Sequence, residues 1–219
     1  MRTISVLALL LALSVFAQAQ AFSNDCSLIF KGSYRKAVKN RKAADGANYT
    51  VHNNGDAISV KDWFDLVCGF DPQLKGKNIT TSTKAMNGFE TVKVTLEGFL
   101  LGARFERQVH QGDGKDNDFH VEISDQSKWK SKHVIVEVPP GPEYCEARKR
   151  IFDLVKQDGC GGDKCILKTP VKIQVTGFVF LDGAHGKTCL IKRGMVVGGV
   201  TGAEGAWEIH PVLEVKKVN

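Results

Sequence analysis

The stretch His133-Val-Ile-Val-Glu-Val138, followed by Pro139-Pro140 and residues 142–157, decides the expected fold. The first six residues have the composition and alternation of a strand, and the two prolines end it. Pro142 near the start of the next segment and an apolar stripe that ends at Val155 predict a helix over residues 142–157. The chain therefore passes from a strand directly into a helix in the middle of its β-rich part.

The segments on either side of this strand and helix also have strand patterns. Gly98 and Gly102 lie where the long first strand could bend or bulge. The order strand, strand, strand, helix, strand, strand is that of an OB-like five-stranded barrel. A ferredoxin-like fold would need a helix directly after its first strand, and none is visible. The other expected strands are residues 89–108, 119–123, 171–181 and 207–218.

The N-terminus has the features of a secretory signal. Arg2 is followed by the apolar run 6–16 and by Ala17-Gln18-Ala19, a small-residue cleavage pattern. The apolar run is too short to span a bilayer comfortably, and no longer one follows. We therefore expect residues 1–19 to be removed, a secreted or periplasmic location, and no transmembrane segment in the mature chain.

Residues 20–85 differ from the barrel segment 86–219 and predict an α-rich N-terminal cap. Ser59-Val60-Lys61-Asp62 resembles a capping box that opens a short helix through Trp63. Six basic residues and no acid occur within residues 31–42, which indicates either a patch for an anionic partner or a solvated helix face. The formal net charge of +6 is too modest to argue for nucleic acid by itself.

An even number of cysteines in an exported chain favours disulfides. Cys160 and Cys165 enclose a short loop and could pair, with a zinc site as the weaker alternative. Elimination then suggests Cys26 with Cys68 and Cys145 with Cys189. The six disulfide candidates are Cys26, Cys68, Cys145, Cys160, Cys165 and Cys189.

Three short polar clusters contain the candidate catalytic or metal-binding residues. In an OB barrel the loop between strands 1 and 2 and the loop between strands 4 and 5 share one rim, so the clusters should converge there, outside the barrel core. Imidazoles with carboxylates suit a divalent metal or acid–base chemistry, whereas turn and surface roles, or a structural network, are the plainer alternatives. The catalytic candidates are Asp118, His120, Asp182, His185 and His210, and the metal candidates are Asp118, His120, His185 and His210.

A second candidate surface lies at the loop between the second and third strands. Lys128, Trp129 and Lys130 occupy the tip of this loop, and His133 follows. An aromatic ring flanked by cations is the arrangement that stacks on bases or sugars. A tryptophan folded back on the barrel edge is the alternative. Phe178 and Phe180 also point away from the core by alternation, and we expect them to meet the N-terminal cap.

Several motifs together resemble a recurring domain of secreted bacterial proteins. The resemblance covers about residues 89–215. It implies export and a bacterial source but no activity. Residues 192–205 form an enlarged, glycine-rich stretch that departs from the pattern. The motifs are Asp118-Phe-His-Val-Glu-Ile123, Val134-Ile-Val-Glu-Val-Pro139, Val175-Thr-Gly-Phe-Val-Phe-Leu-Asp182, His185-Gly186 and Glu208-Ile-His-Pro-Val-Leu213.

Three hypotheses follow for function. The first is a secreted, disulfide-stabilised OB-like module that binds an oligosaccharide or nucleic acid, so that its partner is a polyanion or glycan. The second is a divalent-metal-assisted, phosphodiesterase-like hydrolase. The third is a structural cell-envelope protein without a ligand. No motif for a named reaction is present.

Overall fold

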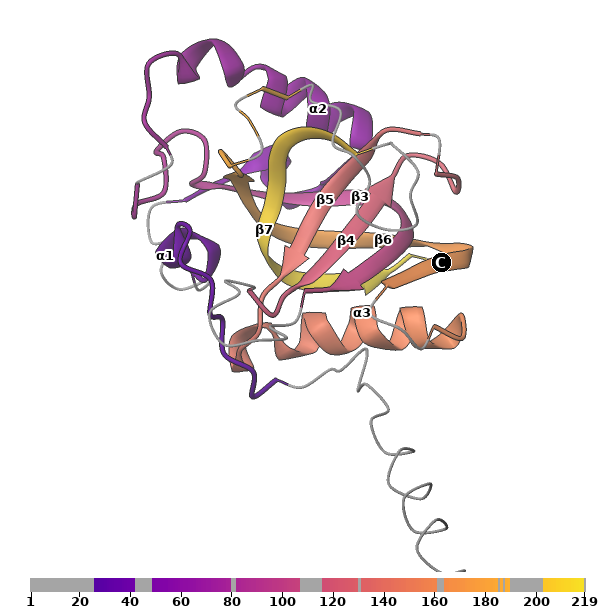
Figure 1. Cartoon of the computed structure of the whole chain (residues 1–219). Helices are drawn as coiled ribbons and strands as arrows, with labels where there is room; N and C mark the ends of the chain where they lie inside the picture. The colour runs from indigo at the N-terminus through magenta and orange to yellow at the C-terminus, as the bar shows by residue number, and fades with distance from the viewer. Residues whose placement is uncertain are drawn as a thin grey trace, which may run out of the picture.

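A computed structural model of the chain describes residues 26–41, 49–79, 82–106, 116–129, 131–160, 164–184, 186, 188–189 and 203–218. Five of its strands form the closed barrel. Each expected strand and the expected helix is present, in the expected order (Figure 1). The barrel strands are β3 (Val92–Phe105), β4 (Phe119–Ser124), β5 (His133–Val138), β6 (Lys164–Leu181) and β7 (Ala203–Lys217).

The strand pairing closes the barrel as the OB-like topology requires. The strands are ordered β3-β4-β5-β7-β6, and β6 pairs again with β3. The pairing of β5 with β7 is parallel, and the other barrel pairings are antiparallel. The register of β3 shifts between Leu100 and Gly102 against both neighbours, so the strand bends where its glycine allows it. The mainly β, OB-like fold predicted from the sequence is confirmed.

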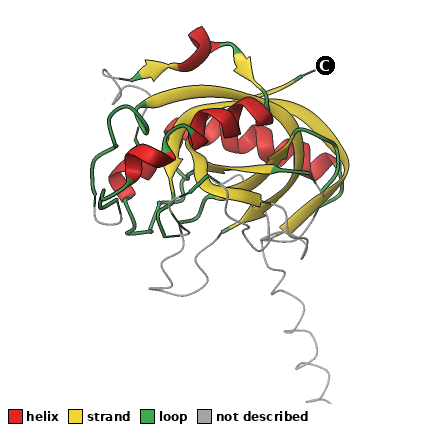
Figure 2. Ribbon diagram, turned by 90° about the horizontal axis from the view of Figure 1, so that it is seen from above, coloured by secondary structure: helices red, strands yellow, loops and turns green. Residues whose placement is uncertain are grey.

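Helices lie at opposite ends of the barrel (Figure 1). Pro142–Tyr144 forms a single 3-10 turn, and α3 (Cys145–Gln157) continues from it. The helix α2 (Val60–Cys68) begins with the expected capping box, in which Ser59 and Asp62 exchange hydrogen bonds. Figure 2 shows the curved strands of the barrel from above. No helix in the described part of the chain is long and apolar enough to cross a membrane.

The N-terminal segment contains short strands as well as helices. The strands β1 (Thr50–Val51) and β2 (Ala57–Ile58) both pair in parallel with β3, which the sequence did not predict. Besides α2, the other elements of this segment are α1 (Lys36–Lys39) and the 3-10 turns His52–Gly55 and Asp71–Leu74.

One hydrophobic core joins the N-terminal segment to the barrel. Trp63 and Val67 of α2 belong to the same buried cluster as Ile151 of α3 and the inward-facing residues of the strands. The segment therefore packs as part of the barrel domain. Burying this shared apolar surface is the main stabilising contribution to the fold.

The three disulfides pair differently from the guess made by elimination. Cys160–Cys165 is confirmed, but the other two pairs are Cys26–Cys145 and Cys68–Cys189. The guess paired Cys26 with Cys68 and Cys145 with Cys189, and both are wrong. The reason is spatial: the start of the described chain runs along the first turn of α3, and the end of α2 meets the segment that precedes β7. Cα–Cα distances of 5.2 and 5.0 Å suit these two bonds.

Candidate functional site

Strand pairing brings one polar side chain from each of three neighbouring strands into a row. His120 on β4 lies opposite Glu137 on β5, and β7 runs along the other side of β5 with Ile209 opposite Val136. Alternation points Val136 and Ile209 into the barrel, so Glu137 and His210 project from its outer face. The register therefore places His120, Glu137 and His210 side by side.

Imidazoles and carboxylates alternate along this row, which we call the histidine–glutamate row. It comprises His210, Glu137, His120, Glu122 and His133. His210 Nδ1 lies 2.6 Å from Glu137 Oε2, and the other oxygen of Glu137 lies 3.1 Å from His120 Nδ1. His120 Nε2 is then 3.4 Å from Glu122 Oε1, and His133 Nδ1 is 3.4 Å from Glu122 Oε2. The two glutamates thus each lie between two histidines.

The row lies outside the barrel but is not exposed to solvent. His120 is 4% exposed, and His133 and His210 are 0% exposed. The expectation that His120 and His210 face outward from the barrel core agrees with the structure. The alternative that Asp118 and His120 are turn and surface residues does not, because both side chains are buried where the N-terminal segment covers this side of the barrel.

Contacts from residues 26–41 form this cover. Asn117 Nδ2 donates to the carbonyl of Ile29 at 3.0 Å, and Lys39 Nζ donates to Asp116 at 2.7 Å. Arg41 donates to the carbonyls of Val179, at 2.9 Å, and of His210, at 3.4 Å. The segment is thereby joined to the start of β4, to β6 and to β7.

Phe178 and Phe180 are covered by the same segment, as the sequence predicted. Both rings are buried on the outer face of β6. The Phe178 ring packs edge-on against Tyr49 and below the guanidinium of Arg41, whose carbon lies 4.4 Å from the ring centroid. The guanidinium carbon of Arg35 lies 5.2 Å from the centroid of the Phe180 ring. Arginine over an aromatic face is a favourable arrangement when it is shielded from water.

Burial and neighbouring charges act in opposite directions on the row. Burial alone lowers the pKa of His120, but the hydrogen bonds and charges of Glu122 and Glu137 outweigh it and raise that pKa to about 10. Burial alone raises the pKa of Glu122, but contacts with His120 and His133 bring it down to about 2. His120 is therefore an imidazolium ion held between two carboxylates at neutral pH.

Asp118 and Glu137 lie close together, and their pKa values shift in opposite directions. Burial raises the pKa of Asp118 well above its usual range, and the charge of Glu137 adds to this effect. Burial acts in the same sense on Glu137, but the charges of His210 and Lys39 outweigh it and hold that pKa well below its usual range. Of these two carboxyl groups, Asp118 therefore has the higher pKa and Glu137 the lower.

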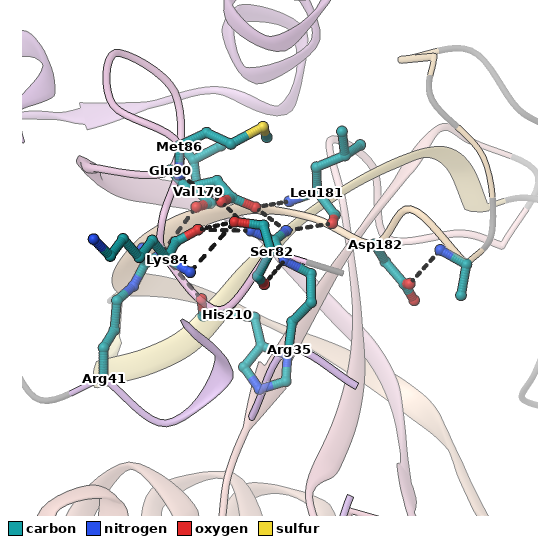
Figure 3. Close-up of polar contacts among 11 residues, drawn as sticks. Arg35, Arg41, Ser82, Lys84, Met86, Glu90, Val179, Leu181, Asp182 and His210 are labelled. Carbon is teal, nitrogen blue, oxygen red and sulfur yellow. Dashed lines mark hydrogen bonds and ion pairs between the residues drawn. The ribbon is translucent and has the colours of Figure 1, made fainter. Parts of the chain in front are cut away.

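A second buried ion pair fixes the N-terminal segment beside the row (Figure 3). The guanidinium of Arg35 donates two hydrogen bonds of 2.5 Å to the two oxygens of Glu90, and both side chains are 0% exposed. Arg35 also donates to the carbonyls of Ser82, Lys84 and Leu181, while Glu90 accepts from the backbone N–H groups of Met86 and Leu181. This pair connects α1, the segment before β3 and the end of β6.

The sequence-predicted candidates fall into three groups. Asp118, His120 and His210 come together, as expected for one shared site. Asp182 lies at the end of β6, is 6% exposed, and accepts a hydrogen bond of 3.1 Å from the N–H of Ala184 (Figure 3). His185 lies outside the described residues.

The candidate residues of the loop between β4 and β5 differ in their exposure to solvent. Lys128 is exposed and Trp129 is partly exposed, whereas Lys130 lies outside the described residues. The indole of Trp129 packs edge-on against the ring of His133, with 5.3 Å between centroids. The expectation that His133 contacts a ligand does not fit its complete burial.

Sequence reasoning missed three side chains of the site. Glu122 and Glu137 alternate with inward-facing apolar residues in strands that were predicted, so strand pairing was the signal that could have found them. Lys39 is 7% exposed and lies 4.0 Å from Glu137 Oε2. It comes from the N-terminal segment, and no pattern in the sequence indicated that this segment crosses the row.

Three residues of the site have the chemistry of a metal centre. Asp118, Glu137 and His210 each offer a ligand atom, and these atoms all lie within 4.8 Å of one another. All three side chains are buried. The arrangement can hold a cation or store protons.

Comparison with known proteins does not assign this chain to a family. No protein-family model matches the chain, and no match was found among curated proteins.

Proposed function

We propose that this chain is exported and acts as a disulfide-stabilised binding module for an anionic oligosaccharide. Three disulfides support an oxidising compartment. The apolar run 6–16, with its small-residue cleavage pattern, supports export. The resemblance of residues 89–215 to domains of secreted bacterial proteins points the same way.

The observation that carries the binding proposal is the Trp129 ring and the lysines beside it. His133 and the close backbone at Gly102 hold the indole, since a Cβ atom at Gly102 would lie only 2.9 Å from Trp129 Cζ2. Lys128 and Lys132 are exposed on either side in sequence, and Lys132 Nζ lies 5.3 Å from the centroid of the Phe64 ring. A held, partly exposed aromatic ring with exposed lysines close to it in sequence suits a sugar ring that bears carboxylate or sulfate groups.

A short glycan fits this surface better than a nucleic acid does. Single-stranded nucleic acids bind OB-like proteins by stacking successive bases along an open strand face. The corresponding outer face of β4 and β5 is occupied here by the buried histidine–glutamate row. One partly exposed aromatic ring remains at the loop, which is enough for one sugar ring but not for a run of bases.

The hydrolase hypothesis has less support. Asp118, His120 and His210 are each less than 5% exposed, beneath the N-terminal segment. A polymeric substrate needs its scissile bond within hydrogen-bond distance of the acid and base. The cover keeps such a bond away from the row.

The proposal is tested by calorimetric titration with a sulfated hexasaccharide, a uronic-acid hexasaccharide and a single-stranded oligonucleotide. We expect the natural chain to bind at least one of the two anionic sugars more tightly than the oligonucleotide. Lys128→Glu combined with Lys132→Glu, and separately Trp129→Leu, should each weaken that binding about tenfold or more, because one stacked ring or a pair of lost ion contacts contributes about 1–3 kcal/mol.

The matched control reverses two other exposed lysines, Lys149 and Lys156, on α3. Lys149→Glu combined with Lys156→Glu makes the same change in net charge and should leave the affinity within about twofold, because the contacts are local. Equal losses of sugar affinity in the two double variants would mean that net charge alone determines the binding, and this result would overturn the proposal. Absence of sugar binding, or tighter binding of the oligonucleotide, would also overturn it.

A further inference from the structure

We propose that Asp118, Glu137 and His210 form a binding site for one divalent transition-metal ion such as Zn²⁺. This inference goes beyond the proposed sugar binding and does not depend on it. It starts from the placement of the three groups: Asp118 directly precedes β4, Glu137 lies near the end of β5, and His210 lies on β7. All three project from the same outer face, where their ligand atoms lie within 4.8 Å of one another.

Unpaired polar atoms point to a ligand at this place. Among the described residues, Asp118 Oδ1 and His210 Nε2 are buried without a hydrogen-bond partner, whereas His210 Nδ1 has Glu137 Oε2 at 2.6 Å. Asp118 is 1% exposed and His210 is 0% exposed, so bulk water does not form hydrogen bonds with these atoms. A buried polar atom left without a partner costs about 1–3 kcal/mol, and a cation bound to Asp118 Oδ1 would supply that oxygen with a partner.

The spacing needs only side-chain adjustment to hold an ion. Bonds of about 2.1 Å to nitrogen and oxygen place tetrahedral ligand atoms about 3.4 Å apart. His210 Nδ1 and Glu137 Oε2 are now 2.6 Å apart, so these two groups must separate by less than about 1 Å. The ligand atoms of the three residues lie up to 4.8 Å apart, so Asp118 must move inward by up to about 1.4 Å. Rotation about side-chain bonds supplies such shifts without moving the strands.

The donor set indicates which class of ion fits. One imidazole nitrogen with two carboxylate oxygens suits Zn²⁺, Co²⁺ or Mn²⁺, whereas Ca²⁺ and Mg²⁺ prefer oxygen ligands alone. Three protein ligands leave a position for water, as in many zinc sites. Thiolates cannot take part, because all six cysteines are in disulfides.

His120 has the position of a supporting group. Its Nδ1 lies 3.1 Å from Glu137 Oε1, the oxygen that faces away from His210. A hydrogen bond to the outer oxygen of a metal-binding carboxylate fixes the orientation of that carboxylate and tunes its charge. Lys39, 4.0 Å from Glu137 Oε2, is the cation that the metal would have to displace or repel.

Equilibrium zinc binding after dialysis against a chelator tests the site. We expect the oxidised natural chain to bind one Zn²⁺ and to melt at a higher temperature with it than without it. Asp118→Asn and His210→Gln should each weaken Zn²⁺ binding at least tenfold and abolish the rise in melting temperature. Ca²⁺ at the same concentration should produce no rise.

His133→Gln is the matched control. His133 is equally buried and belongs to the same row, but it contacts Glu122 at the opposite end. This variant should keep zinc affinity within about threefold of the natural chain. Equal losses in His133→Gln and His210→Gln would overturn the proposal, because the loss would then reflect damage to the row as a whole.

X-ray absorption of the zinc-loaded natural chain tests the site even if a variant does not fold. The proposal requires one imidazole nitrogen, with the other donors oxygen and none sulfur. Absence of bound zinc, or a zinc ion held by two or more imidazoles, would overturn it.

Discussion

Replacing Arg35 by methionine should lower the free energy of unfolding by about 3–5 kcal/mol, the largest effect expected from any single substitution in this chain. The change removes a guanidinium that makes two hydrogen bonds to Glu90 and leaves that carboxylate fully buried. Two backbone N–H groups still reach Glu90, but the opposite charge is lost. Most of the loss is the cost of a buried, uncompensated charge.

Urea unfolding followed by circular dichroism measures this effect. Lys61→Met is the control, because it breaks an ion pair with Asp65 in which the side chains are 77% and 65% exposed. Exposed pairs contribute little, so the control should unfold at the urea concentration of the natural chain. Combining Arg35→Met with Glu90→Met should be less harmful than Arg35→Met alone, since no buried charge remains. A loss in Arg35→Met no larger than in the control would contradict the account of this ion pair.

Removal of the Cys68–Cys189 disulfide should also have a large effect. Its two cysteines are separated by 121 residues, so the bond strongly restricts the unfolded chain. In the chain-entropy description a loop of this length contributes about 4–5 kcal/mol of stability. We expect Cys68→Ala combined with Cys189→Ala to lower the free energy of unfolding by about 4 kcal/mol, measured by urea unfolding at equal protein concentration.

The short Cys160–Cys165 disulfide provides the comparison. Its cysteines are only 5 residues apart, for which the same description gives about 2 kcal/mol. Cys160→Ala combined with Cys165→Ala should therefore be about half as destabilising. An equal or larger loss in this variant would show that local packing, rather than loop length, sets the contribution of the disulfides.

The order of elements in the barrel could be predicted because each strand carries its own signal. In the segment 133–138 alternation, β-branched residues and the two following prolines all favour a strand. The start of β6 was harder to predict. The sequence pattern predicted a strand from Val171, whereas β6 starts at Lys164, because pairing with β3 extends the strand through residues whose local pattern is weak.

The site could be predicted only in part. Alternation correctly placed His120 and His210 outside the barrel core, and the loop arrangement correctly brought them together with Asp118. Their burial could not be predicted, because it depends on a segment about 80 or more residues earlier in the chain. Alternation tells which face a side chain takes but not what packs on that face.

The disulfide pairing failed for the same physical reason. Elimination favoured cysteines that are close in sequence or left over, whereas pairing requires Cα atoms within about 7 Å in the folded chain. Cys26 and Cys145 meet because the N-terminal segment runs along the start of α3. The same segment places Lys39 against the histidine–glutamate row. The course of this segment, which the sequence did not predict, therefore explains both the Cys26–Cys145 bond and the burial of the row.

Polar residues from distant parts of the chain form one buried row. A double-mutant cycle between Glu137 and His210 probes this arrangement, with Glu137→Gln, His210→Gln and the double variant compared by urea unfolding. For groups 2.6 Å apart and shielded from water, we expect a coupling energy of at least about 1 kcal/mol. A coupling energy indistinguishable from zero would contradict this arrangement.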